Sequence, residues 1–115
     1  MIFPVHPRTR KRLEELRTKG GKSLQLVSPL SYLQFLHLQS EAAVVITDSG
    51  GIQEESTTLG VPCLTVRSNT ERPITVSMGT NTIVGPDAER LLKEAFRILS
   101  GCRKQGGVPE LWDGR

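Results

Sequence analysis

Residues able to bind an anionic ligand gather in one short segment, Thr47–Glu55, which reads TDSGGIQEE. Its two adjacent glycines, Gly50 and Gly51, allow a tight turn and a close approach of the backbone to a ligand. A helix that begins there presents unpaired N–H groups and the positive end of its dipole, a suitable place for a diphosphate. Ser49 can add a hydroxyl donor. The alternative is an ordinary strand–turn–helix connection capped by Asp48 or Ser49, and the glycines alone favour it.

Two carboxylates follow this turn, and they argue against an ordinary connection. Glu54 and Glu55 would repel a phosphate if both faced it, so at least one must face elsewhere. A carboxylate that accepts hydrogen bonds from vicinal ribose hydroxyls, as in dinucleotide-binding folds, meets this requirement. The alternative is that both residues only interact with the positive end of the helix dipole. This alternative suits Glu54 better than Glu55, which lies deeper in the predicted helix.

A second polar segment, Arg67–Pro73, reads RSNTERP and follows the next predicted strand. Because ligands bind at the carboxyl ends of parallel strands, this segment and the first should lie on the same rim of a sheet. Arg72 could hold a phosphate through its forked guanidinium group, and Thr70 and Glu71 could contact sugar hydroxyls. His6 ends the first predicted strand and could donate a hydrogen bond or a proton to a phosphate. The alternatives are a solvated loop with a weak Glu–Arg pair and a structural histidine.

An alternation of predicted strands and helices positions these residues. Strands are predicted at residues 1–5, 24–27, 42–47, 62–66 and 81–84. Helices are predicted at 8–19, from 31 to at least 38, at 52–59, at 73–78, and between a cap at Asp87 and a stop at Gly101. The apolar run 42–47 is typical of a strand buried on both faces. The alternation predicts the α/β class, with βαβ units and a parallel sheet covered by helices on both sides.

Length and composition restrict the class of protein. The chain has 115 residues, of which 37% are hydrophobic and 23% charged, and this suits one globular domain rather than a disordered or membrane protein. Aromatic residues make up 4%, so the core is expected to consist mainly of Val, Leu, Ile and Ala. The two cysteines form neither a disulfide framework nor a zinc-ligand spacing, and Cys63 is expected to be a small buried side chain. Because no signal peptide is recognisable, we expect a reduced cytoplasmic protein.

The net charge of +3 is unevenly distributed, because residues 1–22 contain seven Lys or Arg and only two Glu. The basic residues of this segment are Arg8, Arg10, Lys11, Arg12, Arg17, Lys19 and Lys22. A basic segment can bind nucleic acid or a phosphorylated small molecule. These side chains point all round the predicted helix and have no interleaved aromatic residues. We therefore expect a solvated helix and not a nucleic-acid site. No membrane partner is expected either, because no uncharged apolar run approaches the roughly 20 residues needed to span a bilayer.

Several of these segments together resemble the non-hydrolysing UDP-N-acetylglucosamine 2-epimerases. They are Val5–Pro7 (VHP), Thr47–Glu55 (TDSGGIQEE), Leu59–Pro62 (LGVP), Asn69–Pro73 (NTERP) and, in the tail, Trp112–Gly114 (WDG). The resemblance extends over nearly the whole chain, and the first polar segment together with Thr70–Pro73 is highly specific.

The resemblance implies a two-domain glycosyltransferase-B architecture with the active site between two Rossmann-like halves. It implies that UDP-N-acetylglucosamine and UDP-N-acetylmannosamine are interconverted by loss of the C2 proton, elimination of UDP to leave a 2-acetamidoglucal, and re-addition of UDP. It implies no nicotinamide and no metal, and it is compatible with a homodimer. Residues 1–105 would be an incomplete carboxyl-terminal, UDP-binding domain and residues 106–115 a truncated tail.

The resemblance also implies roles for particular residues. His6 would lie at the diphosphate and assist the leaving group, and Phe35 would pack on the uracil. Ser49 and the backbone of the two glycines after it would hold the phosphates, Glu55 would bind the ribose hydroxyls, and Arg72 would contact a phosphate. The acidic residues that handle the C2 proton belong to the family's amino-terminal domain, so the isolated chain is expected to be inactive. The remaining alternative is the nucleotide-sugar-binding half of a glycosyltransferase, which shares the fold and a similar ribose site.

Overall fold

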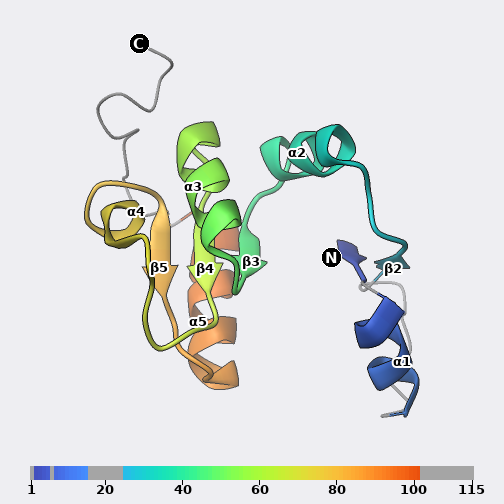
Figure 1. Cartoon of the computed structure of the whole chain (residues 1–115). Helices are drawn as coiled ribbons and strands as arrows, with labels where there is room; N and C mark the ends of the chain where they lie inside the picture. The colour runs from blue at the N-terminus through green and yellow to red at the C-terminus, as the bar shows by residue number, and fades with distance from the viewer. Residues whose placement is uncertain (1, 6, 16–24, 102–115) are drawn as a thin grey trace. The chain divides into compact units, whose positions relative to one another are not determined.

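The computed structural model of the chain describes residues 2–5, 7–15 and 25–101, in which strands and helices alternate as predicted (Figure 1). The strands are β1 (Ile2–Pro4), β2 (Gln25–Val27), β3 (Val45–Thr47), β4 (Cys63–Thr65) and β5 (Asn81–Ile83). The helices are α1 (Pro7–Glu15), α2 (Tyr32–Ser40), α3 (Gly50–Leu59), α4 (Pro73–Ser77) and α5 (Ala88–Leu99). No helix in these ranges is long and apolar enough to cross a membrane.

The chain forms two compact units, and the boundary between them falls within α2, after Phe35. In the amino-terminal unit, β1 and β2 pair in parallel with Phe3 opposite Leu26. The N–H of Val5 continues the ladder by donating to the carbonyl of Val27 at 2.8 Å. Parallel neighbours need a crossover connection, and α1 lies in that connection.

Helix α1 carries part of the basic segment. Its Arg8, Lys11 and Arg12 are exposed, as expected of a solvated helix. The basic residues Arg17, Lys19 and Lys22 lie outside the described residues.

The carboxyl-terminal unit contains a three-stranded parallel sheet in the order β3-β4-β5. Leu64 at the centre of β4 lies opposite Ile46 of β3 and Thr82 of β5. Both figures place α3 and α5 on opposite faces of this sheet. The predicted α/β class with helices on both sides is therefore confirmed for this unit.

Burial in the sheet differs from the sequence prediction in one strand. The run 42–47 was predicted to be buried on both faces, but Ile46 in β3 is 40% exposed, so that prediction is wrong for this strand. β3 pairs with β4 on one side only within the sheet, whereas β4 has strands on both sides. Every residue of β4 is buried, including Cys63, whose burial was expected.

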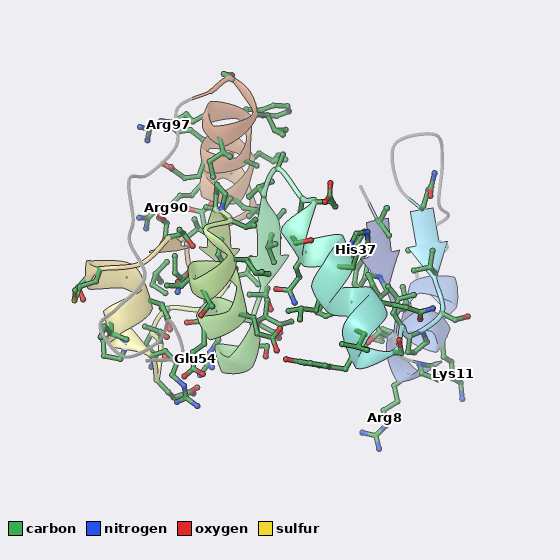
Figure 2. All side chains as sticks on the ribbon, turned by 90° about the horizontal axis from the view of Figure 1, so that it is seen from above. Arg8, Lys11, His37, Glu54, Arg90 and Arg97 are labelled. Atoms are coloured by element: carbon green, nitrogen blue, oxygen red, sulfur yellow. The ribbon has the colours of Figure 1, made fainter. Side chains whose placement is uncertain are left out.

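Local signals set the ends of the two long helices of this unit. Gly60 ends α3 with φ of 72°, a left-handed conformation that costs glycine little. Asp87 caps α5, because its carboxylate accepts hydrogen bonds from the N–H groups of Glu89 at 3.0 Å and Arg90 at 3.2 Å. Arg90 and Arg97 project from one side of α5 (Figure 2), as polar residues of an amphipathic helix should.

The buried side chains are more polar than the composition predicts. Among the described residues, the buried apolar side chains are Val5, Val61, Cys63, Leu64 and Val84. The buried polar side chains are Gln39, Thr47, Gln53, Ser56, Thr57, Thr65, Thr75, Thr80 and Asn81. Buried polar groups require hydrogen-bond partners, and four of these residues, Gln53, Thr65, Thr75 and Asn81, are joined to one another by side-chain hydrogen bonds.

Candidate functional site

Helix α3 begins directly after β3, and its first turn has the features of an anion site. Ser49 is the N-cap residue in extended conformation, and its carbonyl accepts the first intrahelical hydrogen bond, from the Gln53 N–H at 3.2 Å. Helix geometry therefore leaves the N–H groups of Gly50 and Gly51 without an intrahelical acceptor. The Ser49 hydroxyl makes no capping hydrogen bond, so the alternative of a capping serine is not what the structure shows.

The predicted meeting of the two polar segments is confirmed. A methyl group built on Gly50 would lie 3.5 Å from Glu71 Oε2 and 3.7 Å from Arg72 Cγ. The loop after β4 therefore packs directly against the first turn of α3, at the carboxyl edge of the sheet. An arginine and a set of backbone donors thus share one small region, which is the arrangement needed to bind a phosphate from two sides.

The two adjacent carboxylates of α3 have different partners. Glu54, labelled in Figure 2, forms an ion pair with Arg72 Nε. Glu55 instead accepts a hydrogen bond of 2.8 Å from Nε2 of Gln39 on α2. Successive helical residues point about 100° apart, so one carboxylate faces the loop and the other faces α2. The requirement that one carboxylate face away from the loop is met.

The backbone of Arg72 is fixed from both ends. Its N–H donates to Thr70 Oγ1 at 2.9 Å, and its carbonyl accepts from Thr75 Oγ1 at 2.6 Å. Both hydroxyl groups are tied to buried amides, since Thr70 Oγ1 donates to Gln53 Oε1 and Asn81 Nδ2 donates to Thr75 Oγ1 at 3.0 Å. Asn81 Nδ2 also lies 3.0 Å from Gln53 Oε1. A buried polar network therefore supports the loop from beneath.

Sequence reasoning missed the members of this network. Gln53, Thr75 and Asn81 are each fully buried, although none stands out by its type. The available signal was the position of Gln53 between the glycine turn and the two carboxylates. Thr70 was expected to contact sugar hydroxyls; in the structure its hydroxyl donates to Gln53 Oε1 and accepts from the Arg72 N–H, which ties it to the loop.

A second ion pair closes the loop on its exposed side. Arg67 Nη2 lies 2.8 Å from Glu71 Oε1, and the side chains are 34% and 59% exposed. The hydrogen bond and charge of Arg67 lower the pKa of Glu71. The Glu–Arg pair anticipated in this loop is present, with Arg67 as the partner of Glu71. Such exposed pairs contribute little to stability.

The remaining predicted site residues lie elsewhere. Phe35 is a half-buried residue of α2 on the amino-terminal side of the unit boundary. His6 falls outside the described residues, as does the tail 106–115. Within the part of the chain that the structure describes, no three His, Cys, Asp or Glu side chains are grouped as metal ligands. Burial raises the pKa of the Cys63 thiol, so Cys63 is not a reactive thiolate.

Comparison with known proteins identifies relatives along the whole chain. A family model described as UDP-N-acetylglucosamine 2-epimerase matches residues 1–114. The UDP-N-acetylglucosamine 2-epimerase of Methanocaldococcus jannaschii is 48% identical over 107 residues, which cover 90% of this chain and 29% of the relative. The enzyme of the same name from Escherichia coli K12 is 42% identical over 100 residues, covering 86% and 27%. The chain thus spans less than a third of the length of these curated relatives.

Solved structures with the same fold are also similar. The M. jannaschii UDP-GlcNAc 2-epimerase in complex with UDP-GlcNAc and UDP superposes with a TM-score of 0.80 at 42% identity, covering 98% of this chain and 33% of that one. The Neisseria meningitidis UDP-GlcNAc 2-epimerase bound to UDP-GlcNAc gives 0.75 at 32% identity, covering 98% and 29%. These likenesses confirm the predicted Rossmann-like fold of the glycosyltransferase-B type. Because the family model matches all but the last residue, this chain belongs to the UDP-N-acetylglucosamine 2-epimerase family.

Proposed function

We propose that this chain binds the UDP moiety of UDP-N-acetylglucosamine and serves as the nucleotide-binding part of a 2-epimerase. The observation that carries the proposal is the packing of the Arg72 loop against Gly50, which joins an arginine to the first turn of α3. The solved M. jannaschii relative is described in complex with UDP-GlcNAc and UDP, which supports this ligand class. Family membership favours an epimerase over the alternative, a glycosyltransferase.

The diphosphate would bind between the turn and the loop. The N–H groups of Gly50 and Gly51 and the Ser49 hydroxyl would donate from one side, and Arg72 from the other. Arg72 Nε is already paired with Glu54, and its Nη1 donates to the Glu71 carbonyl at 3.4 Å, so the guanidinium is oriented before the ligand binds. The pair also compensates the charge of Glu54, which would otherwise repel the phosphates.

The nucleoside would be recognised by Glu55, Phe35 and the residues around them. An ionised carboxylate accepts hydrogen bonds only, and vicinal ribose hydroxyls supply two donors, so Glu55 suits the ribose. Phe35 would pack on the uracil ring through its aromatic face. His6, which ends the first strand, would donate to the diphosphate.

In the proposed reaction these residues act on the leaving group. A base removes the C2 proton, a double bond forms between C1 and C2, and the C1–O bond breaks so that its electrons pass to the diphosphate of UDP. Negative charge therefore increases on the phosphate oxygen, where the α3 N–H donors, Arg72 and His6 would stabilise it. Re-addition of UDP to the 2-acetamidoglucal, with protonation of C2 on the other face, gives UDP-N-acetylmannosamine.

Calorimetric titration of the 115-residue chain tests the ligand assignment. UDP should bind more tightly than free N-acetylglucosamine, because every proposed contact addresses uracil, ribose or phosphate. Uridine should bind more weakly than UDP, since it lacks the phosphates that the turn and Arg72 would hold. Binding of the free sugar that equals or exceeds that of UDP would refute the proposal.

A further inference from the structure

We infer that Gln39 is a positioning residue that orients Glu55 for the ribose and thereby sets the preference for ribonucleotides over deoxyribonucleotides. The inference deepens the proposed UDP-binding function and rests on it. It concerns a residue whose type and place in the sequence give no indication of a role in binding. It is carried by one contact between α2 and α3 and by the burial of the group that makes it.

The contact joins a buried amide to a half-buried carboxylate. Gln39 is only 3% exposed, and its Nε2 donates to Glu55 Oε2 at 2.8 Å. Glu55 is partly accessible, so its carboxylate can still meet a ligand. An ionised carboxylate has about four acceptor positions, and Gln39 uses one of them. The remaining positions are sufficient for two ribose hydroxyls.

The charge of Glu55 determines which way the amide turns. With Nε2 directed at the carboxylate, Gln39 Oε1 is buried and has no hydrogen-bond partner among the described residues. Turning the amide over would place its oxygen against the carboxylate, where two acceptors repel each other. The amide orientation that leaves Oε1 without a partner is therefore the one that gives Glu55 a hydrogen-bond donor.

This arrangement is a poor solution for stability alone. A buried acceptor without a partner is unfavourable, whereas an apolar side chain of the same length would leave no polar group unsatisfied. Methionine at position 39 would fill similar space with neither donor nor acceptor. Gln39 therefore contributes by orienting Glu55. Its replacement by an apolar residue should weaken ribose recognition without lowering the stability of the fold.

Glu54 and Glu55, adjacent on α3, have partners on different sides of the helix. Glu54 is drawn to Arg72 and so to the phosphate side, whereas Glu55 is drawn to Gln39 and so away from it. Without the amide donor, the Glu55 side chain would have to be ordered by the ligand itself. Ordering a flexible side chain on binding lowers affinity.

The test compares dissociation constants for UDP and 2′-deoxy-UDP, measured by calorimetry on the 115-residue chain. The ratio of the 2′-deoxy-UDP constant to the UDP constant reports recognition of the 2′-hydroxyl and is insensitive to uniform loss of binding. Gln39→Met should lower the ratio by about threefold to tenfold. The midpoint of thermal unfolding should stay the same or rise, because an unpartnered acceptor is removed. Gln39→Leu is the second variant and should behave in the same way.

A matched control and a double variant test whether Gln39 acts through Glu55. Gln34 is an exposed glutamine of the same helix whose Oε1 accepts from the Ser31 N–H, so Gln34→Leu should leave the ratio unchanged. Glu55→Ala should lower the ratio by itself. In that background Gln39→Met should have no further effect, because Gln39 acts through Glu55.

Each other outcome has a definite meaning. If Gln39→Met and Gln39→Leu leave the ratio unchanged, or both reduce thermal stability, Gln39 has only a structural role and the inference is wrong. If the ratio falls equally with and without Glu55, Gln39 does not act through that carboxylate, which also overturns it. If Glu55→Ala leaves the ratio unchanged, or the wild-type chain does not bind UDP, the proposed function fails at the ribose or as a whole, and this inference fails with it.

Discussion

Arg72 joins the two parts of the candidate site, the first turn of α3 and the loop after β4. Its side chain is paired with Glu54 on α3, and its backbone is held by hydroxyl groups at both ends. The residue is therefore positioned before any ligand arrives. Pre-organised donors cost less to bring to a phosphate than mobile ones, so a partly exposed arginine can still contribute to affinity.

Replacing Arg72 should weaken the binding of phosphates and leave nucleoside binding intact. A hydrogen bond to a charged group contributes about 1.5–3 kcal/mol, so Arg72→Ala should weaken UDP binding about 10-fold to 150-fold. Arg72→Lys should recover only part of the loss, because an ammonium group lacks the planar fork that Glu54 and a phosphate can share. Calorimetry with UDP and uridine measures both effects. An equal loss for uridine would show that Arg72 holds the fold and not the phosphate.

The ion pair on the outer side of the loop can be tested through titration. Arg67 lowers the pKa of Glu71 by a hydrogen bond and by its charge, both of which favour the ionised carboxylate. Arg67→Ala should therefore raise the Glu71 pKa toward the ordinary value for glutamate. Titration followed by carbon-13 NMR of the side-chain carboxyl group measures the shift. An unchanged pKa would mean that this pair is not formed in solution.

At the scale of elements, local signals predicted what the structure shows. The Asp87 cap and the left-handed Gly60 each act within a few residues, and they begin α5 and end α3 where expected. Helix α3 begins at Gly50, two residues before the predicted start at Ile52, so the two glycines belong to its first turn. The order of strands and helices followed from the same kind of signal. Parallel topology then placed the loop after β4 beside the start of α3, so the meeting of the two polar segments could also be predicted.

Contacts that a neutral amide makes with a residue distant in the sequence could not be predicted in this way. Gln39 meets Glu55 across 16 positions, and Asn81 meets Gln53 across 28. Neither pair combines opposite charges or follows a helical or strand period, so nothing in the sequence joins its members. The polarity of the buried region was missed for the same reason, because composition favoured an aliphatic core. Ile46 was predicted to be buried because an apolar run does not reveal the place of a strand in its sheet.

The first turn of α3 offers a test that separates stability from binding. A methyl group on Gly51 would meet only Ser49 Oγ, at 3.9 Å, and glycine is a poor helix former. Gly51→Ala should therefore leave the free energy of unfolding unchanged or raise it by about 0.5–1 kcal/mol. The same methyl group would stand where a phosphate must approach the backbone, so UDP should bind more weakly. Denaturant unfolding and calorimetry give the two values, and unchanged UDP affinity would place the phosphates elsewhere.

We expect the 115-residue chain as a whole to bind UDP-N-acetylglucosamine without catalysing its epimerisation. Epimerisation needs a base at C2 and an acid on the opposite face, and Glu54, Glu55 and Glu71 are already engaged with Arg72, Gln39 and Arg67. The chain also spans less than a third of its curated relatives. Incubation of UDP-N-acetylglucosamine with the chain in deuterated water, followed by NMR, should show no deuterium at C2. Exchange catalysed by this chain alone would contradict the expectation.

The polar character of the buried side chains has a consequence for the heat capacity of unfolding. Exposing apolar surface raises the heat capacity, whereas exposing polar surface lowers it. The described part of the chain buries threonines, glutamines and an asparagine beside a few aliphatic residues. Its heat-capacity increment should therefore lie below the roughly 12–15 cal/mol/K per residue of ordinary domains, as scanning calorimetry can measure. A smaller increment makes the curve of free energy against temperature flatter, so the temperature of greatest stability lies farther below the melting point.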